Sequence, residues 1–198
     1  GSEPIFEHYN IETEIDRALG RLVWLDCGGY LVFDETEALT VVDVNTGKYT
    51  GKKNLEETIL KTNLEAAEEI ARQIRLRDIG GMIIVDIIDM NVAEHRQQVL
   101  ERLQQGMSRD RTKNQVLGFT SLGLIEITRK RVTQGLSAMM QQPCSYCHGK
   151  GRVLLPEVVS SRVERELKKI LHRRGVEAVL VEMNSEVAAL LIGSGGAY

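Results

Sequence analysis

Two apolar segments set the architecture of this chain: Val41-Val42-Asp43-Val44-Asn45-Thr46-Gly47 and Gly81-Met82-Ile83-Ile84-Val85-Asp86-Ile87-Ile88-Asp89. Both are rich in β-branched residues and lie next to a glycine, which is typical of buried strands. Each nevertheless contains an aspartate, and an ionised carboxylate is costly to bury unless another group compensates its charge. Two such aspartates on strands that can lie side by side indicate a shared cation. We therefore predict that Asp43 and Asp86 bind one Mg²⁺, which prefers oxygen ligands and often uses only one or two protein carboxylates.

The residues between these segments predict a crossover connection. The polar stretch 46–54 is rich in glycine and lysine and predicts a loop. A long helix follows, with Thr62-Asn63-Leu64-Glu65 as a possible capping box and an apolar face made by Ala66, Ala67, Ile70, Ala71 and Ile74. A strand, a helix and a second strand form the crossover unit of an α/β sheet, in which ligands collect at the carboxyl ends of the strands. Asp43 and Asp86 both come late in their strands, as such a site requires.

The flanking sequence predicts further strands and helices around this unit. Before it we expect a helix over 3–20 and antiparallel strands over 22–25, 30–33 and 39–42. After it we expect a helix over 91–108 and strands at about 114–119 and 122–128. The fold class is therefore α/β, with a mixed sheet and flanking helices. Beyond it, the sequence predicts a small α/β domain with a helix over 156–174, a strand over 178–183 and a short helix over 185–191.

Basic residues gather around the last two predicted strands of the sheet. Because they border strand ends repeatedly, they form either a track for phosphates or a solvated rim. These residues are Arg109, Arg111, Lys113, Arg129, Lys130 and Arg131. Three arginines near the end of the long helix (Arg72, Arg75, Arg77) likewise either complement the helix dipole or bind phosphate.

Polar residues after the second apolar segment also have two interpretations. Asn91 and Glu94 have the spacing of a capping pair, so Asp89 and Asn91 either cap the next helix or help to bind metal. His95 lies in the first turn of that helix and is expected to be a surface residue rather than a base. The acidic stretch 34–37 is expected to be a solvated turn.

Composition narrows the class of protein. The chain has 198 residues, of which 42% are hydrophobic and 27% charged, and these values predict a globular protein with either one sizeable core or one domain plus a small appendage. The formal net charge of −3 excludes a bulk polycation, so contacts with nucleic acid must come from local basic clusters. No apolar run reaches transmembrane length. Gly1-Ser2 resembles a cloning scar, and we expect the chain to be a piece of a longer protein. Three cysteines without framework spacing predict a reducing, cytoplasmic setting.

The pair Cys144 and Cys147, followed by His148-Gly149-Lys150-Gly151, has the spacing of half a structural zinc site. Either His148 and another group complete the tetrahedron, or a second copy of the chain supplies two more thiolates and the Zn²⁺ links a dimer. The same residues match the attachment pattern of haem c and the spacing of a redox dithiol. The glycines after the pair and the lack of an export signal favour zinc. Cys27 is expected to be a small buried hydrophobe.

Together these motifs resemble the catalytic region of the bacterial ribonuclease E/G family. The resemblance rests on the segments 36–45, 62–73, 76–81 and 85–90 and on the cysteine turn. It implies the tail of an RNase H-like segment at 1–19 and a DNase I-like subdomain at 20–142. A zinc-link at 143–152 and the small domain at 153–198 are implied to follow. Ser145 stands where the family's link usually has proline, which changes the stiffness of the turn but not its ligands.

The resemblance also implies roles for single residues. The positions that match Asp43 and Asp86 bind Mg²⁺ in the family, and the position of Asn45 supports them by hydrogen bonding. Lys113 matches a basic position near the scissile phosphate, and Cys144 and Cys147 match the thiols of the zinc-link. The implied activity is endonucleolytic hydrolysis of single-stranded RNA to 5′-phosphate and 3′-hydroxyl ends.

The implied partners are RNA and other copies of the chain. A shared Zn²⁺ predicts a homodimer, possibly doubled into a tetramer, and the parent protein is expected in an RNA-decay assembly. Lys113, Arg109, Arg111 and Arg129 are the residues predicted to contact RNA. The alternative is a zinc-linked module for RNA binding and oligomerisation that has little catalytic activity on its own.

Overall fold

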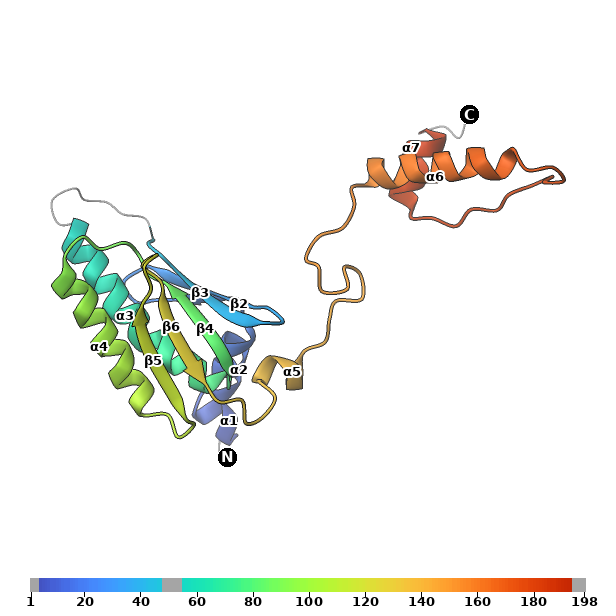
Figure 1. Ribbon diagram of the computed structural model, residues 1–198. Helices are drawn as coiled ribbons and strands as arrows, with labels where there is room; N and C mark the ends of the chain where they lie inside the picture. The colour runs from blue at the N-terminus through green and yellow to red at the C-terminus, as the bar shows by residue number, and fades with distance from the viewer. Residues whose placement is uncertain (1–3, 48–54, 194–198) are drawn as a thin grey trace. The chain divides into compact units, whose positions relative to one another are not determined.

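The computed structural model describes residues 4–47 and 55–193 and divides the chain into two compact units, Gly1–Gln141 and Gln142–Tyr198. Figure 1 shows the α/β sheet of the first unit and the helices of the second. In the described part of the chain, no helix combines the length and the hydropathy needed to cross a bilayer.

The first unit is built on a six-stranded mixed sheet with the order β1-β2-β3-β4-β6-β5. Its strands are β1 (Leu22–Trp24), β2 (Tyr30–Glu35), β3 (Leu39–Asn45), β4 (Gly81–Asp86), β5 (Asn114–Phe119) and β6 (Ile125–Arg129). Only β3 and β4 are parallel, and the helix α3 (Leu55–Leu76) connects them. The predicted crossover unit is therefore confirmed, and the remaining neighbours are antiparallel.

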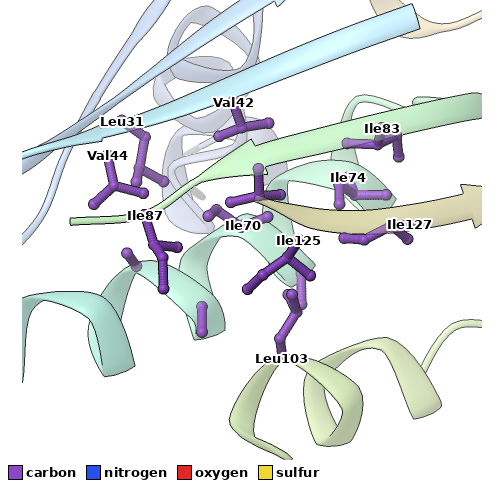
Figure 2. Packing of buried hydrophobic residues seen from close by; sticks show 14 of the residues in the cluster. Leu31, Val42, Val44, Ile70, Ile74, Ile83, Ile87, Leu103, Ile125 and Ile127 are labelled. Carbon is purple, nitrogen blue, oxygen red and sulfur yellow. The ribbon is translucent and has the colours of Figure 1, made fainter. Parts of the chain in front are cut away.

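One face of the sheet packs against α3 and α4 (Ala93–Ser108), as Figure 1 shows. Alternate residues of the strands point into this layer, and Figure 2 shows Val44 of β3 beside Leu31 of β2. The helices contribute fully buried side chains such as Ile70 and Leu103. Because successive strand residues point to opposite faces, the intervening residues of β3 and β4, including Asp43 and Asp86, lie on the other face.

The start of α3 differs from the predicted capping box. The helix begins at Leu55, so Thr62 lies well inside it, and its hydroxyl donates to the carbonyl of Thr58 (2.9 Å). The carboxylate of Glu65 instead accepts hydrogen bonds from the backbone N–H groups of Asp26 and Cys27. The helix extends towards the N-terminus because partly buried residues before Thr62 continue its apolar stripe. These are Ile59 and Leu60.

The start of α4 also differs from prediction. Its N-cap is Val92, which makes no side-chain capping bond, so Asn91 and Glu94 do not form a capping pair. The N–H of Val92 instead donates to Glu56 of α3 (3.4 Å). A tertiary contact thus takes the place of the local cap.

The predicted helix over 3–20 is two helices, α1 (Ile5–His8) and α2 (Ile11–Leu19). They are separated near Asn10, whose φ of 53° lies in the left-handed region and is incompatible with a continuous α-helix. The helix α2 packs as part of the first unit, where Glu14 forms an ion pair with Arg72 of α3 (2.7 Å). A further short helix, α5 (Leu136–Met140), lies near the end of this unit.

The second unit is helical where the structure describes it, which corrects the predicted small α/β domain. It consists of α6 (Pro156–Leu171) packed against α7 (Ser185–Ile192), and Asn184 rather than Ser185 caps α7. Residues 178–183 form no strand, and Leu180 is 91% exposed. A strand needs a neighbour to satisfy its backbone groups, and the described part of this unit supplies none. The glycine-rich end beyond residue 193 lies outside the described residues.

Candidate active site

The two aspartates predicted to bind metal are direct neighbours across the parallel pair of strands. Asp43 and Asp86 are register partners in β3 and β4, and both lie at the carboxyl ends of their strands. Asp43 is half-buried and Asp86 is exposed. Sequence reasoning therefore identified the two carboxylates that the fold brings together.

The side chain of Asn45 supports this pair. Its amide Nδ2 donates a 2.7 Å hydrogen bond to Oδ2 of Asp43. The two residues are separated by one position of β3, so alternation places both on the same face of the sheet. An amide that donates to one carboxylate oxygen fixes the carboxylate and leaves its other oxygen free to bind a ligand.

The electrostatics at this edge favour a bound cation. Partial burial raises the pKa of Asp86 above its ordinary value, and the nearby charges of Asp43 and Asp89 raise it further. Among the described residues, no ion pair neutralises Asp43 or Asp86. Like charges held together by a fold are relieved either by a proton or by a cation, and Mg²⁺ takes one or two carboxylates of this kind. The donor set therefore fits that ion.

Asn63 of α3 holds the segment that follows Asp86. The sequence predicted Asn63 only as part of a capping box and did not predict this role. Its side chain is fully buried, donates to the carbonyl of Ile88 (2.8 Å) and accepts from the Ile88 N–H (3.1 Å). This pair of bonds fixes the backbone between Asp86 and Asp89. A polar side chain on the otherwise apolar face of a helix is the sequence signal that points to such a role.

His95 lies in the first turn of α4, and its side chain contacts Glu56 of α3. It is partly buried, and its Nδ1 lies 3.3 Å from Oε1 of Glu56, which also accepts from the N–H of Val92. Glu56 thus joins the start of α3 to the start of α4. The geometry gives His95 a structural contact and corrects its expected place as a simple surface residue.

The structure does not bring Lys113 to the carboxylates. Lys113 precedes Asn114, which pairs with Arg129 of β6, and Arg129 pairs in turn with Gly81 at the start of β4. Asp86 lies at the other end of β4, about 16 Å away along the strand at roughly 3.3 Å per residue. The antiparallel register of β5 and β6 carries Lys113 to the opposite end of the strands from Asp86. The implied position of Lys113 beside the scissile phosphate is therefore corrected.

The other basic residues divide into two groups. Arg109 and Arg111 are exposed in the connection from α4 to β5, at the same edge as Lys113, where a phosphate track remains a prediction. Arg129 is buried, with its guanidinium paired to Asp110 (2.6 Å) and Asp78 (2.6 Å). Its predicted contact with RNA is corrected, since a side chain enclosed by two carboxylates belongs to the core.

The cysteine pair lies in a tight turn of the second unit. The N–H of His148 donates to the carbonyl of Cys144 (2.7 Å), and His148 adopts a left-handed φ of 50°. The N–H groups of Cys147 and Tyr146 and the thiol of Cys147 lower the pKa of Cys144, which favours the thiolate that binds metal. In the described part of the chain, no three His, Cys, Asp or Glu residues gather in a group that could hold a metal. One chain therefore offers two thiol ligands here.

Comparison with known proteins agrees with the sequence motifs. Residues 1–132 match the model of the ribonuclease E/G family. Ribonuclease G of Escherichia coli (strain K12) is 47% identical over 193 residues, which cover 98% of this chain and 40% of that protein. Ribonuclease G of Haemophilus influenzae is 45% identical over 97% of the chain, which corresponds to 39% of its own length. Ribonuclease E of Escherichia coli (strain K12) is 40% identical over 96% of the chain and 17% of its own length.

The chain spans about two fifths of the ribonuclease G proteins that it matches. The matched region includes the whole of the sheet and both aspartates at its carboxyl edge. Because the family model covers well over half of the sequence and the resemblance of the motifs is confirmed, the chain belongs to the ribonuclease E/G family.

Proposed function

We propose that this chain is the catalytic portion of a Mg²⁺-dependent endoribonuclease that hydrolyses single-stranded RNA in RNA processing and decay. The products would carry 5′-phosphate and 3′-hydroxyl ends. One observation carries the proposal: Asp43 and Asp86 are register partners at the carboxyl ends of two parallel strands. Membership of a family whose relatives are ribonucleases supports RNA as the substrate.

In this proposal the carboxylates of Asp43 and Asp86 hold the ion. When bound, Mg²⁺ polarises a phosphate and stabilises the negative charge that develops during hydrolysis. Asn45 keeps the Asp43 carboxylate in one orientation, and Asn63 holds the backbone after Asp86 in place. By these hydrogen bonds Asn45 and Asn63 orient the groups that would bind the metal, which is the role of the residues surrounding metal ligands.

The test removes each carboxylate's charge without changing its size. Asp43→Asn and Asp86→Asn are each incubated with a labelled single-stranded oligoribonucleotide in Mg²⁺ or EDTA, beside the unaltered chain and an Asp16→Asn control. Asp16 is exposed on α2. The unaltered chain and the control should cut only with Mg²⁺ and leave 5′-phosphate ends, whereas both variants should be inactive. Full cutting by either variant would contradict the proposal.

A second candidate function has its own support, namely the exposed cysteine turn. Two thiols that need further ligands suit an assembly module in which Zn²⁺ joins two copies of the chain. The chain would then bind RNA and oligomerise, with little cleavage by itself. Retention of RNA in EDTA without cutting, together with a dimer that depends on zinc, would favour this function.

A further inference from the structure

An aromatic pair, the exposed Trp24 and the half-buried Tyr30, lies on the same face of the sheet as the two aspartates. The register places Trp24 of β1 opposite Tyr30 of β2, and Tyr30 opposite Asn45 of β3. Val23 is fully buried on the helix side, so its neighbour Trp24 points to the other face, where it remains 59% exposed. The row formed by Trp24, Tyr30 and Asn45 therefore ends at the residue that supports Asp43.

The two rings form a defined surface. Their centroids lie 5.2 Å apart and their planes are inclined at 54°. The edge strand that carries Trp24 is held by Arg17, whose guanidinium donates to the Trp24 carbonyl (3.1 Å). A large aromatic side chain that stays mostly exposed on a fixed backbone offers a flat apolar surface. Such a surface suits the binding of a flat ligand.

The pair lies close enough to the aspartates to touch the same RNA strand. The neighbouring row on this face runs from Leu22 through Val32 and Asp43 to Asp86. The strands β1 and β3 are two strand spacings apart, roughly 10 Å. An RNA strand whose phosphate lies at Asp43 and Asp86 can therefore place a neighbouring base within reach of Tyr30 and Trp24.

The negative charges of this face repel RNA phosphates, so uncharged contacts are important for binding RNA there. The charged residues at its register positions are all carboxylates, namely Asp34, Asp43, Asp86 and Glu126. Asp34 is paired with Arg21. The exposed basic residues Arg109, Arg111 and Lys113 lie towards the other end of the sheet. Among the described residues of this face, affinity for the nucleotides next to the cut must therefore come from the bound cation and from contacts to bases.

We propose that Trp24 and Tyr30 form a base-stacking subsite for the unpaired nucleotides next to the phosphate that is cut. This inference rests on the proposed function, because it takes RNA as the substrate of the same site. Every base has a flat π-face, so stacking on aromatic rings binds single strands with little sequence preference. Bases inside a duplex already stack on one another, so the subsite favours unpaired RNA.

The chain provides a direct reporter, because Trp24 is its single tryptophan. We would titrate the Asp43→Asn/Asp86→Asn chain, which is not expected to cut, with a short single-stranded oligoribonucleotide and follow tryptophan fluorescence. An oligomer of the same length without bases and an RNA duplex serve as comparisons. Saturable quenching by the single strand alone is the expected result. Unchanged fluorescence while a labelled single strand binds, or no binding at all, would overturn the subsite.

Two substitutions distinguish base stacking on the Trp24 ring from a general hydrophobic contact. Trp24→Phe keeps a ring and should retain most of the affinity, whereas Trp24→Leu should bind the oligoribonucleotide about 5-fold to 100-fold more weakly, the range expected when one stacking ring is removed. Met82→Ala is the matched control, since Met82 is exposed on the same face at the far end of β4. Equal affinity of the Leu and Phe variants would contradict the inference.

The outcomes also distinguish the subsite from the proposed function. If the double aspartate variant still cuts RNA, the assignment of Asp43 and Asp86 fails, while the fluorescence titration continues to decide the stacking role. If the double variant is inactive and Trp24 remains unquenched by bound RNA, the catalytic assignment survives and the subsite is rejected.

Discussion

The side-chain amide of Asn45 donates a 2.7 Å hydrogen bond to Oδ2 of Asp43, and this bond fixes one of the two carboxylates at the edge of the sheet. Asn45→Ala should therefore weaken Mg²⁺ activation by about 10-fold to 100-fold, the usual effect of losing a group that orients a metal ligand. The measurement is the cleavage rate as a function of Mg²⁺ concentration. Partial recovery at high Mg²⁺ is expected, since the ligands themselves remain. The exposed neighbour Thr46 provides the control Thr46→Ala, and an equal effect of both substitutions would contradict the role of Asn45.

We expect the carboxylate of Asp86 to destabilise the folded chain, although the proposed function requires it. Its pKa is raised in the folded chain by burial and by the charges of Asp43 and Asp89, so the folded state binds a proton more tightly than the unfolded state. Stability should therefore fall as pH rises through the interval between the ordinary pKa of about 3.9 and the raised value, and the loss is complete once the pH exceeds the raised pKa.

Replacing the charged carboxylate of Asp86 by a neutral amide should restore the stability that is lost at high pH. In EDTA at pH 7, Asp86→Asn should raise Tm by up to about 2 °C, a small effect because solvent screens an exposed carboxylate. Mg²⁺ should raise the Tm of the unaltered chain but have little effect on the variant, because a ligand stabilises only the state that binds it. A lower Tm for Asp86→Asn in EDTA, or equal Mg²⁺ effects on both chains, would count against the shared-cation interpretation.

Asn63 should contribute to both stability and activity. Asn63→Leu leaves the N–H and carbonyl of Ile88 without their partners, and each unsatisfied buried group costs about 1–3 kcal/mol. Urea unfolding should show this decrease, and cleavage should decrease further than the loss of folded protein explains, since Asp86 and Asp89 flank Ile88. Asn91→Ala is the control at an exposed asparagine of the same connection. Full activity of folded Asn63→Leu would show that the backbone at Ile88 does not need this support.

The buried Arg129 should make the sheet sensitive to acid. Two hydrogen bonds, the first from Thr133 and the second from Arg129, lower the pKa of Asp78. Burial opposes ionisation of Asp110, but its bonds to Arg129 and Thr112 outweigh this and lower its pKa as well. Both carboxylates thus contribute stability that is present at neutral pH and is lost as pH falls below about 4, through their lowered pKa values.

Removal of the guanidinium should cost more than removal of an exposed charge. Arg129→Met leaves the carboxylate of Asp110 buried without its partner, which should destabilise the chain by about 3–5 kcal/mol in urea unfolding at pH 7. Its exposed neighbour provides the control Lys130→Met, which should change stability little. Arg129→Met combined with Asp110→Leu should recover part of the loss. If Arg129→Met is as stable as Lys130→Met, the ion-pair network is not what holds these strands.

The cysteine turn should control assembly through zinc. We propose that Zn²⁺ binds the two thiols of this turn and that a second copy of the chain supplies the other two ligands of the tetrahedron. Cys144→Ser, or treatment with a strong chelator, should convert a dimer to a monomer in sedimentation, and Zn²⁺ should restore the dimer only for the unaltered chain. Cys27→Ser, at the cysteine outside the turn, should leave assembly unchanged. A dimer that persists after zinc is stripped would reject the shared site.

Local sequence was sufficient to predict the strands of the sheet, the crossover and the carboxylate pair. The alternation of apolar and polar residues is visible within a single strand, and a parallel crossover brings the carboxyl ends of β3 and β4 to the same end of the sheet. For this reason Asp43 and Asp86 can be identified from the sequence pattern, whereas the role of Asn45 came from the family resemblance. The two thiols of Cys144 and Cys147 were likewise identified by their spacing, because a tight turn acts over a few residues.

Only the tertiary structure decided the roles of residues that meet across the fold. The register of β5 and β6 placed Lys113 far from Asp86, and packing enclosed Arg129 between two carboxylates, although in sequence it resembles the exposed Lys130 and Arg131 beside it. The register across three strands likewise aligned Trp24 with Asn45. Such relationships depend on how distant segments pair, and the free energy of that pairing comes from the whole core rather than from the residues near any one position.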